Sequence, residues 1–341
     1  MMRDEVNYSL LAHNTFGIDA RCFRFLEYAD IEDAQMVAKM LRGIPTPPLI
    51  IGGGSNLLLT GDYDSYVVHS AIKGHEVLPA DDADHLLLRV GSGEVWDDVV
   101  ALCVKNGWQG AENLSLIPGE VGASAVQNIG AYGSEASHII YKVEAVEIST
   151  GQLREFKAED CQYGYRQSRF KTEWKNRFLI THVTYRLSKQ TGNLNIEYGN
   201  IRAELERRHI DNPTLQQLRD VIIDIRNNKL PDPKVLGNAG SFFMNPVVGR
   251  EQYERLLAQY PQMPHYHIDE QHEKIPAGWL IEQAGWKGRS IGPAGVHDRQ
   301  ALVLVNRGGA RGADIVYLCQ QIQKDVLDRF GIQINPEVNI I

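Results

Sequence analysis

The chain has 341 residues, which is more than a single hydrophobic core usually organises, so we expect two or three domains. A hydrophobic content of 43% and a charged content of 23% are typical of an ordinary globular protein and not of a disordered or fibrous one. The formal net charge of -8, with no block rich in Lys or Arg, argues against a nucleic-acid-binding protein.

The first half of the chain alternates helical and extended patterns, which predicts layered helices and sheets. A first helix is expected between Asp30, as its cap, and Gly43, as its end, and a second helix starts near Trp96 and ends at Gly107. Short apolar runs predict strands at residues 48–51, 66–69, 86–90, 143–148 and 178–187.

The pattern changes after about residue 200. An amphipathic helix carries Leu215, Leu218, Ile222 and Ile225 and is followed by two prolines. Helical patterns follow near residues 252–259 and 277–284, then a strand at 301–306, a long helix that Gly331 ends, and a final strand at 333–341. We therefore expect a smaller unit at roughly 220–325.

Two glycine-rich segments are candidates for binding a cofactor through the backbone. Residues 52–57 follow a strand but match neither the G-x-G-x-x-G nor the Walker A pattern, and a tight structural turn explains them equally well. Residues 117–133 contain four glycines, the amides of Gln127 and Asn128, and one charged residue. That composition favours close wrapping around a large, partly anionic cofactor over a purely structural loop.

Three further segments carry polar groups that have common structural explanations. Arg166 could hold a carboxylate or phosphate, although a surface ion pair is the usual role of a single Arg. Lys229 and Lys234 flank a proline-stiffened loop that could seat a diphosphate. The histidines at 265, 267 and 272 fit no zinc spacing, so we expect no metal site there.

The segment 237–246 sets the hydroxyl of Ser241 behind Gly237 and Gly240 and before Phe242 and Phe243. The glycines permit close approaches or backbone conformations that a Cβ would block, and the aromatic rings could exclude water. By itself the pattern is most often a buried turn with a satisfied serine.

The four cysteines are scattered without a C-x-x-C pair, and neither a signal-peptide pattern nor an apolar run long enough for a membrane span is present. These features predict a reduced cytoplasmic protein without disulfides, zinc or membrane insertion.

Eight segments, in order and over nearly the whole chain, resemble the UDP-N-acetylenolpyruvoylglucosamine reductase family. They are residues 14–17, 52–56, 117–119, 127–133, 163–166, 229–234, 237–246 and 336–337. The resemblance implies an α+β fold with a two-part FAD-binding domain of the PCMH/VAO type and a smaller α+β substrate-binding domain. It assigns residues 1–219 to FAD, as subdomains 1–65 and 66–219, residues 220–325 to the substrate, and residues 326–341 to a C-terminal strand that returns to the FAD-binding region.

The resemblance also implies the reaction and its cofactors. NADPH would reduce a non-covalently bound FAD, which would reduce the enolpyruvyl ether of UDP-N-acetylglucosamine enolpyruvate to UDP-N-acetylmuramate for peptidoglycan synthesis. The enzyme is expected to be a cytoplasmic monomer that acts on this small molecule.

Site residues follow from the same resemblance. Ser241 would give a proton to C2, and Arg166 and Glu337 would stabilise the enolate. Substrate contacts are expected from Tyr198, Lys229, Asn245, Tyr266 and Gln300. The cofactor contacts are expected from Gly52, Gly53, Gly54, Ser55, Asn56, Leu57, Ser115, Ile117, Pro118, Gly119, Gly122, Ala123, Gln127, Asn128, Gly130, Ala131 and Tyr132.

Two other functions are compatible with the sequence. One is another FAD oxidoreductase with an alcohol or hydroxy-acid substrate, although residues 50–60 lack the His or Cys that often tethers flavin. The other is a nucleotide-sugar-binding protein that has lost the reaction, against which Arg166, Ser241 and Glu337 argue.

Overall fold

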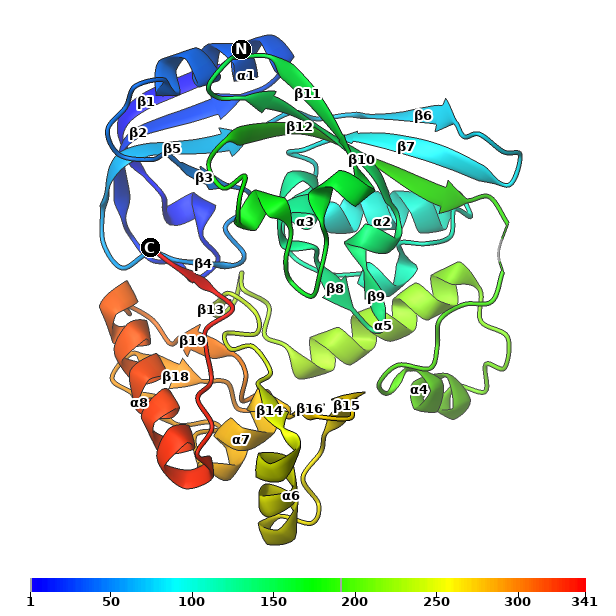
Figure 1. The fold of residues 1–341 in the computed structure, drawn as a ribbon, viewed down its shortest axis with the longest axis vertical. Coiled ribbons are helices and arrows are strands. Elements are labelled where there is room, and N and C mark those ends of the chain that lie inside the picture. The colour runs from blue at the N-terminus through cyan, green and yellow to red at the C-terminus, as the bar shows by residue number, and fades with distance from the viewer. Residues whose placement is uncertain (1, 191) are drawn as a thin grey trace. The chain divides into compact units, whose positions relative to one another are not determined.

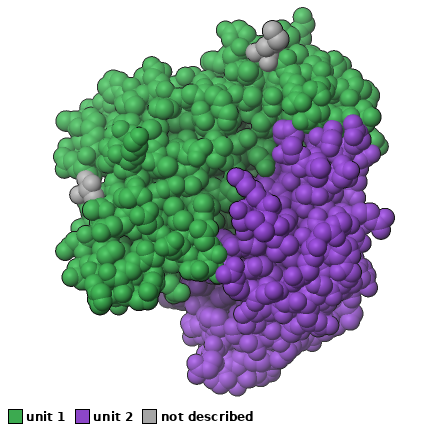
Figure 2. Space-filling view, turned by 180° about the vertical axis from the view of Figure 1, so that it is seen from behind, with its two compact units in different colours: residues 1–8, 22–53, 63–228 green, residues 9–21, 54–62, 229–341 purple. Residues whose placement is uncertain are grey.

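The computed structural model describes residues 2–190 and 192–341, which divide into two compact units (Figures 1 and 2). Unit 1 comprises residues 1–8, 22–53 and 63–228, and unit 2 comprises residues 9–21, 54–62 and 229–341. Both units mix helices with small sheets, in agreement with the predicted α+β class.

Unit 1 contains two larger sheets. A four-stranded sheet has the order β1-β2-β5-β3, from strands β1 (Arg3–Ser9), β2 (Arg21–Tyr28), β5 (Tyr63–Ser70) and β3 (Leu49–Ile51), in which β5 runs parallel to both β2 and β3. A five-stranded antiparallel sheet has the order β11-β10-β12-β7-β6, from strands β11 (Leu153–Lys157), β10 (Ile140–Glu147), β12 (Phe178–Ser188), β7 (His85–Gly91) and β6 (His75–Pro79).

Helices of unit 1 bury their apolar faces against these sheets (Figure 1). Helix α1 (Ile31–Leu41) packs on Leu26 and Val68 of one sheet and on Val146 of the other. Helices α2 (Trp96–Lys105) and α3 (Val121–Gln127) share the main core with β7, β10 and β12. Further strands and α-helices of unit 1 are β8 (Gly130–Ala131), β9 (Ser134–Glu135), α4 (Ile201–Arg207) and α5 (Leu215–Lys229, whose last residue clusters with unit 2).

Unit 2 is built on a four-stranded sheet with the order β13-β19-β18-β17. Its strands are β13 (Gly237–Asn238), β19 (Leu304–Asn306), β18 (Ala294–Val296) and β17 (Ser290–Ile291), and helix α8 (Gly312–Phe330) contacts the last three. A smaller sheet joins β14 (Val247–Gly249), β16 (His272–Lys274) and β15 (Tyr266–Asp269), and helices α6 (Arg250–Gln259) and α7 (Ala277–Gln283) complete the C-terminal region.

Three distant segments of the sequence join in unit 2. Strand β20 (Asn339–Ile340) pairs in parallel with β4 (Leu57–Leu58), which begins at the last residue of the first glycine segment. The Thr15 hydroxyl donates a hydrogen bond to the Asn238 carbonyl at 2.6 Å, and the Asn238 N–H donates to the Thr15 carbonyl at 3.0 Å. The segments 9–21 and 54–62 are therefore part of the same core as the C-terminal third.

Most predicted elements are confirmed. Asp30 caps α1 by accepting a hydrogen bond from the Asp33 N–H at 2.7 Å, and Gly331 ends α8 with φ of +66°. The predicted strands at 66–69, 86–90, 143–148 and 178–187 correspond to β5, β7, β10 and β12.

Two strand predictions were too long. Of residues 301–306 only 304–306 form β19, and of residues 333–341 only 339–340 form β20. Apolar side chains of these segments outside the strands are buried by tertiary packing and not by a strand ladder: Ala301, Ile334 and Val338 are all less than 5% exposed. The segment 117–133 was predicted as a wrapping loop, but helix α3 occupies its centre.

The predicted domain boundary between residues 219 and 220 falls inside α5. The assignment of one domain to FAD and the other to the substrate rests on the family resemblance and stays a prediction.

Candidate functional site

The two glycine segments meet in unit 1. A Cβ placed on Gly52 would lie 3.1 Å from the Cβ of Ala123, and one placed on Gly53 would lie 3.6 Å from the Cα of Gly119. The segment before α3 therefore packs directly on the turn after β3. The cofactor residues predicted at 52–53 and 119–123 are brought together, although more than 60 residues separate them in the sequence.

The second glycine segment continues from α3 into a fixed turn. Asn128 is fully buried, with φ of +46°, and its side chain donates hydrogen bonds to the Gly164 carbonyl at 2.9 Å and to the Glu135 carboxylate at 2.8 Å. Ser115 is also fully buried and donates to the Glu112 carbonyl at 2.6 Å. The side chains of both predicted cofactor residues thus stabilise the loop itself.

Arg166 lies beside this turn. Its Nη2 donates to the Gly130 carbonyl at 2.7 Å, and its own backbone has φ of +56°, a left-handed conformation that is unfavourable for Arg. The chain around it forms a tight bridge in which the N–H groups of Gly164 and Gln167 each donate to the other's carbonyl at 3.0 Å. The predicted site residue Arg166 is therefore fixed against the predicted cofactor residue Gly130.

Arg226 of α5 is a further cation at this place, and the motifs in the sequence did not indicate it. Burial lowers the pKa of its guanidinium, hydrogen bonding to Tyr132 opposes that effect, and the charge of Arg166 lowers the pKa further. Its Nε is buried and has no hydrogen-bond acceptor among the described residues. A bound anion would supply the missing acceptor.

The sequence could have pointed to Arg226 in one way. Arg226 stands three residues before Lys229 on a helix, so its spacing places it near the same face as a predicted substrate residue. Asn113 was missed as well: it is buried and donates to the carbonyls of Tyr132 and Asn195 at 3.0 and 2.8 Å, which ties the second glycine segment to the loop that carries Tyr198.

In unit 2 the segment 237–246 forms the predicted turn. Gly240 has φ of +69°, and a Cβ on Gly237 would lie 2.3 Å from the Phe16 carbonyl oxygen, so both glycines are required. The prediction that Phe242 and Phe243 shield Ser241 is not supported, because both rings are buried in the core and Ser241 is exposed. The rings anchor the turn and leave the hydroxyl at the surface.

Glu337 lies beside this turn. Its N–H donates to the Phe242 carbonyl at 2.8 Å, and Phe243 forms an antiparallel bridge with Pro336. The carbonyl of Glu337 accepts a hydrogen bond from the Asn56 side chain at 3.4 Å. Unit 2 therefore brings together Ser241, Glu337 and the end of the first glycine segment.

The predicted substrate residues are distributed over both units. In unit 2, Asn245 accepts a hydrogen bond from the Ala277 N–H at the start of α7 at 2.9 Å, Gln300 accepts one from the Leu302 N–H at 3.2 Å, and Tyr266 lies on β15 with 47% of its surface exposed. Lys229 is exposed at the end of α5. In unit 1, Tyr198 is 48% exposed and lies next to Gly133.

The remaining predicted residues follow the same division. Unit 1 carries Ile117, Pro118, Gly122, Gln127, Ala131 and Tyr132, and unit 2 carries Gly54, Ser55 and Leu57.

The histidine-rich segment forms a hairpin in which the imidazole rings contact carboxylates. His265 and His267 each place Nδ1 at 3.0 Å from a different oxygen of the buried Glu273, and His272 pairs with Asp269 at 2.9 Å. Within the residues that the structure describes, no group of three or more His, Cys, Asp or Glu side chains is placed to hold a metal ion.

In residues 2–190 and 192–341, no helix combines the length and apolar composition of a membrane span.

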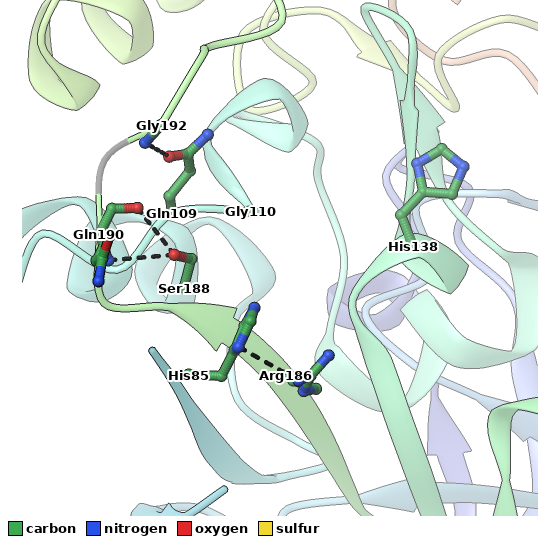
Figure 3. A pocket seen from close by; sticks show the side chains of 8 residues that line it. All are labelled: His85, Gln109, Gly110, His138, Arg186, Ser188, Gln190 and Gly192. Carbon is green, nitrogen blue, oxygen red and sulfur yellow. Dashed lines mark hydrogen bonds between the residues drawn. The ribbon is translucent and has the colours of Figure 1, made fainter. Parts of the chain in front are cut away.

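A hollow of about 500 Å³ lies in unit 1 near the end of β12 (Figure 3). It contains none of the predicted site residues. His85 and Arg186 face each other there, and both pair with Asp82, His85 at 2.8 Å. Because these polar side chains already have partners, the hollow is not a candidate for the site.

Two family models match separate parts of the chain. Residues 24–157 match the model of an FAD binding domain, and residues 232–341 match the model of the C-terminal domain of UDP-N-acetylenolpyruvoylglucosamine reductase. The chain is 54% identical over 337 residues to the UDP-N-acetylenolpyruvoylglucosamine reductase of Bacteroides fragilis, covering 99% of this chain and 100% of that one. It is 47% identical to the enzyme of that name from Pseudomonas aeruginosa, with 97% of each chain covered.

The fold agrees as well. The solved structure of UDP-N-acetylenolpyruvylglucosamine reductase from Thermus caldophilus matches with a TM-score of 0.68 at 19% identity, covering 100% of this chain and 98% of that one. The predicted α+β fold with an FAD-binding domain is thus confirmed. Given identity of this level over its full length, the chain belongs to the UDP-N-acetylenolpyruvoylglucosamine reductase family.

Proposed function

We propose that this chain reduces the enolpyruvyl ether of UDP-N-acetylglucosamine enolpyruvate to UDP-N-acetylmuramate, with FAD as its cofactor and NADPH as the hydride source. Family membership over the full length and the match to an FAD binding domain support FAD-dependent reduction in peptidoglycan synthesis. The observation that carries the proposal is the backbone pairing between the Ser241 turn and Glu337, which lie almost 100 residues apart in the sequence, at the end of a glycine segment.

The FAD would be held by the two glycine segments, 52–57 and 115–133. Two guanidinium groups beside these segments suit an anionic cofactor, because Arg166 lies near Gly130 and Arg226 lies near Tyr132. The Nε of Arg226 has no hydrogen-bond acceptor within the described chain. When bound, FAD supplies the transfer of a hydride from NADPH to the methylene carbon of the enolpyruvyl group.

Reduction at the methylene carbon leaves negative charge at C2, which the substrate carboxylate shares. Arg166, held in one orientation by the Gly130 carbonyl, would supply fixed donors to that charge. Glu337, if it is protonated or hydrogen-bonded to the carboxylate of the substrate, would supply another. Ser241, exposed at the surface of its turn, would deliver the proton to C2.

The sugar nucleotide would be held mainly by polar side chains of unit 2. Lys229 would bind the diphosphate, and Tyr198, Asn245 and Gln300 would donate hydrogen bonds. The partial exposure of Tyr198 and Tyr266 leaves their rings available to cover the substrate. All four cysteines are buried free thiols, which is compatible with the reducing cytoplasm in which we propose that the enzyme works.

An anaerobic half-reaction experiment tests the proposal. The purified protein is reconstituted with FAD, reduced with one equivalent of NADPH, and mixed with UDP-N-acetylglucosamine enolpyruvate. We expect the absorbance of oxidised flavin to return in proportion to the substrate added. If the flavin is reduced but stays reduced, the protein is an FAD oxidoreductase with a different substrate.

A further inference from the structure

His69 lies between two carboxylates at the base of the glycine segments in unit 1. It belongs to β5, where it pairs with Glu27 of β2 on one side and with Ile51, the last residue of β3, on the other. Its side chain is 10% exposed. His69 is therefore fixed between two strands that run parallel to its own, beside the residue that precedes Gly52.

Both ring nitrogens of His69 face carboxylate oxygens. Nδ1 lies 2.8 Å from a Glu27 oxygen, and Nε2 lies 3.1 Å from each of the two Glu120 oxygens. A neutral imidazole has one N–H and one lone pair, so one nitrogen would present its lone pair to an anion. The geometry therefore favours the imidazolium, which donates from both nitrogens.

Glu120 in turn touches the first glycine segment. Cβ atoms built on Gly52 and Gly53 would lie 3.3 and 3.8 Å from Glu120 carboxylate oxygens. Glu120 also stands between Gly119 and Gly122, at the start of α3, and is the one charged residue of the segment 117–133. A carboxylate is thus located among the backbone groups that are expected to approach the diphosphate of FAD, where its negative charge would oppose binding.

We propose that His69 is a positioning residue of the FAD site, whose imidazolium neutralises Glu120 and holds it against the sheet so that the glycine segments can accept an anionic cofactor. This inference rests on the proposed function, because it takes the glycine segments as the FAD site. It explains why a carboxylate is tolerated there: with His69 charged, Glu120 forms an internal ion pair instead of presenting an uncompensated charge.

The environment of His69 makes this role pH-dependent. Burial lowers the pKa of His69, but hydrogen bonds and charges of Glu120 and Glu27 outweigh burial and raise it overall. Among the elements around it, β2 contributes Glu27, the start of α3 contributes Glu120, β3 contributes no titratable group, and Arg3 of β1 acts on Glu27. Since its pKa is raised, His69 keeps its charge to a higher pH than an ordinary histidine, and the ion pair with Glu120 is lost as pH rises through that pKa.

A double-variant titration tests the proposal. The dissociation constant for FAD is measured by quenching of flavin fluorescence on addition of apo-protein, for the wild type, His69→Gln, Glu120→Gln and the double variant. We expect His69→Gln to weaken binding by about ten-fold or more, since it leaves Glu120 uncompensated. The double variant should recover to within about three-fold of the wild type, and Glu120→Gln alone should bind at least as tightly as the wild type.

A purely structural role gives a different result. If the double variant binds FAD as weakly as His69→Gln, or if Glu120→Gln is itself weakened, charge neutralisation is wrong. Unchanged binding by His69→Gln also overturns the proposal. Should His69→Gln fail to fold, as judged by circular dichroism, Glu120→Gln still decides the question. In that variant the affinity should also no longer fall at high pH, whereas that of the wild type should.

His182→Gln is a matched control. His182 belongs to the same unit, and burial lowers its pKa to about 4, so it is neutral and should not affect the affinity for FAD. Failure of the wild type itself to bind FAD would count against the proposed function, and not against the role of His69.

Discussion

Ser241 is exposed while the next two residues are buried aromatics, so its hydroxyl is available to a ligand and its backbone is fixed. We predict that Ser241→Ala leaves flavin reduction by NADPH intact and slows reoxidation by the enolpyruvyl substrate roughly 10²- to 10⁴-fold, as expected for loss of a general acid. Stopped-flow absorbance separates the two half-reactions. Equal loss of both would indicate that Ser241 acts in the fold and not in proton transfer.

Glu337 is half-buried, and its backbone, not its carboxylate, forms the contacts with Phe242 and Asn56. Glu337→Gln should therefore leave the turn intact and reduce kcat about 10²- to 10³-fold through loss of charge stabilisation. The expected result is an unchanged flavin content per chain. Loss of bound FAD in this variant would contradict the assignment.

Arg226 has a buried donor that needs an acceptor. Because the proposed anion is FAD, Arg226→Gln should weaken FAD binding roughly 10- to 100-fold, the range for a lost charge-assisted hydrogen bond. The affinity is read from the quenching of flavin fluorescence as apo-protein is added. Arg202→Gln, at an exposed arginine that pairs with Glu197, is the control and should change little. A variant at Arg226 that binds normally would show that this donor serves another partner.

At the scale of elements, the ion pair between Asp97 of α2 and Arg219 of α5 fixes one helix against another. Arg219 is 8% exposed and donates to both Asp97 oxygens at 2.7 and 2.9 Å, and Asp97 also accepts from the Leu116 N–H at 2.5 Å. Asp97→Asn leaves the buried guanidinium without its charge partner. We expect a loss of about 3 kcal/mol in the free energy of unfolding, measured with urea at pH 7.

The pH dependence of that loss follows from the pKa of Asp97. Burial raises the pKa of Asp97, but the hydrogen bonds and charge of Arg219 and the hydrogen bond from the Leu116 N–H lower it by more, so the net pKa is below that of the unfolded chain. The stabilisation is present above the unfolded pKa of about 4 and disappears as pH falls through the folded value. The difference between wild type and Asp97→Asn should therefore shrink toward pH 2. A difference that is constant from pH 7 to pH 2 would exclude the ion pair as its cause.

Elements with local signals were predictable. Helices α1 and α8 each have an apolar face. Asp30 marks the start of α1 and Gly331 marks the end of α8, so these signals can be read from the local sequence. Strands β4 and β20 have two residues each and exist because they pair with each other across almost the whole sequence. A run this short has no periodicity, so the sequence does not predict it.

At the scale of the whole molecule, unit 2 is discontinuous. A Cβ on Gly312, at the start of α8, would lie 1.9 Å from the Leu59 carbonyl oxygen, and Phe16 packs edge-on against Phe242 at 6.2 Å between ring centroids. Residues 9–21 and 54–62 thus complete the core of the C-terminal third. We predict that residues 229–341 expressed alone will show no cooperative thermal unfolding, unlike the full chain in the same buffer. A sharp transition would mean that the fragment has a sufficient core of its own.

The sequence by itself determined the α+β class, the long amphipathic helices, the glycine segments and the family resemblance, because each of these depends on local periodicity or on residue order. Only the tertiary structure decided that residues 52–53 meet 119–123, that Glu337 lies beside the Ser241 turn, and that Arg226 and His69 interact with Tyr132 and Glu120 of the second glycine segment. Contacts between distant segments depend on how the core packs, and side-chain packing leaves no local pattern in the sequence.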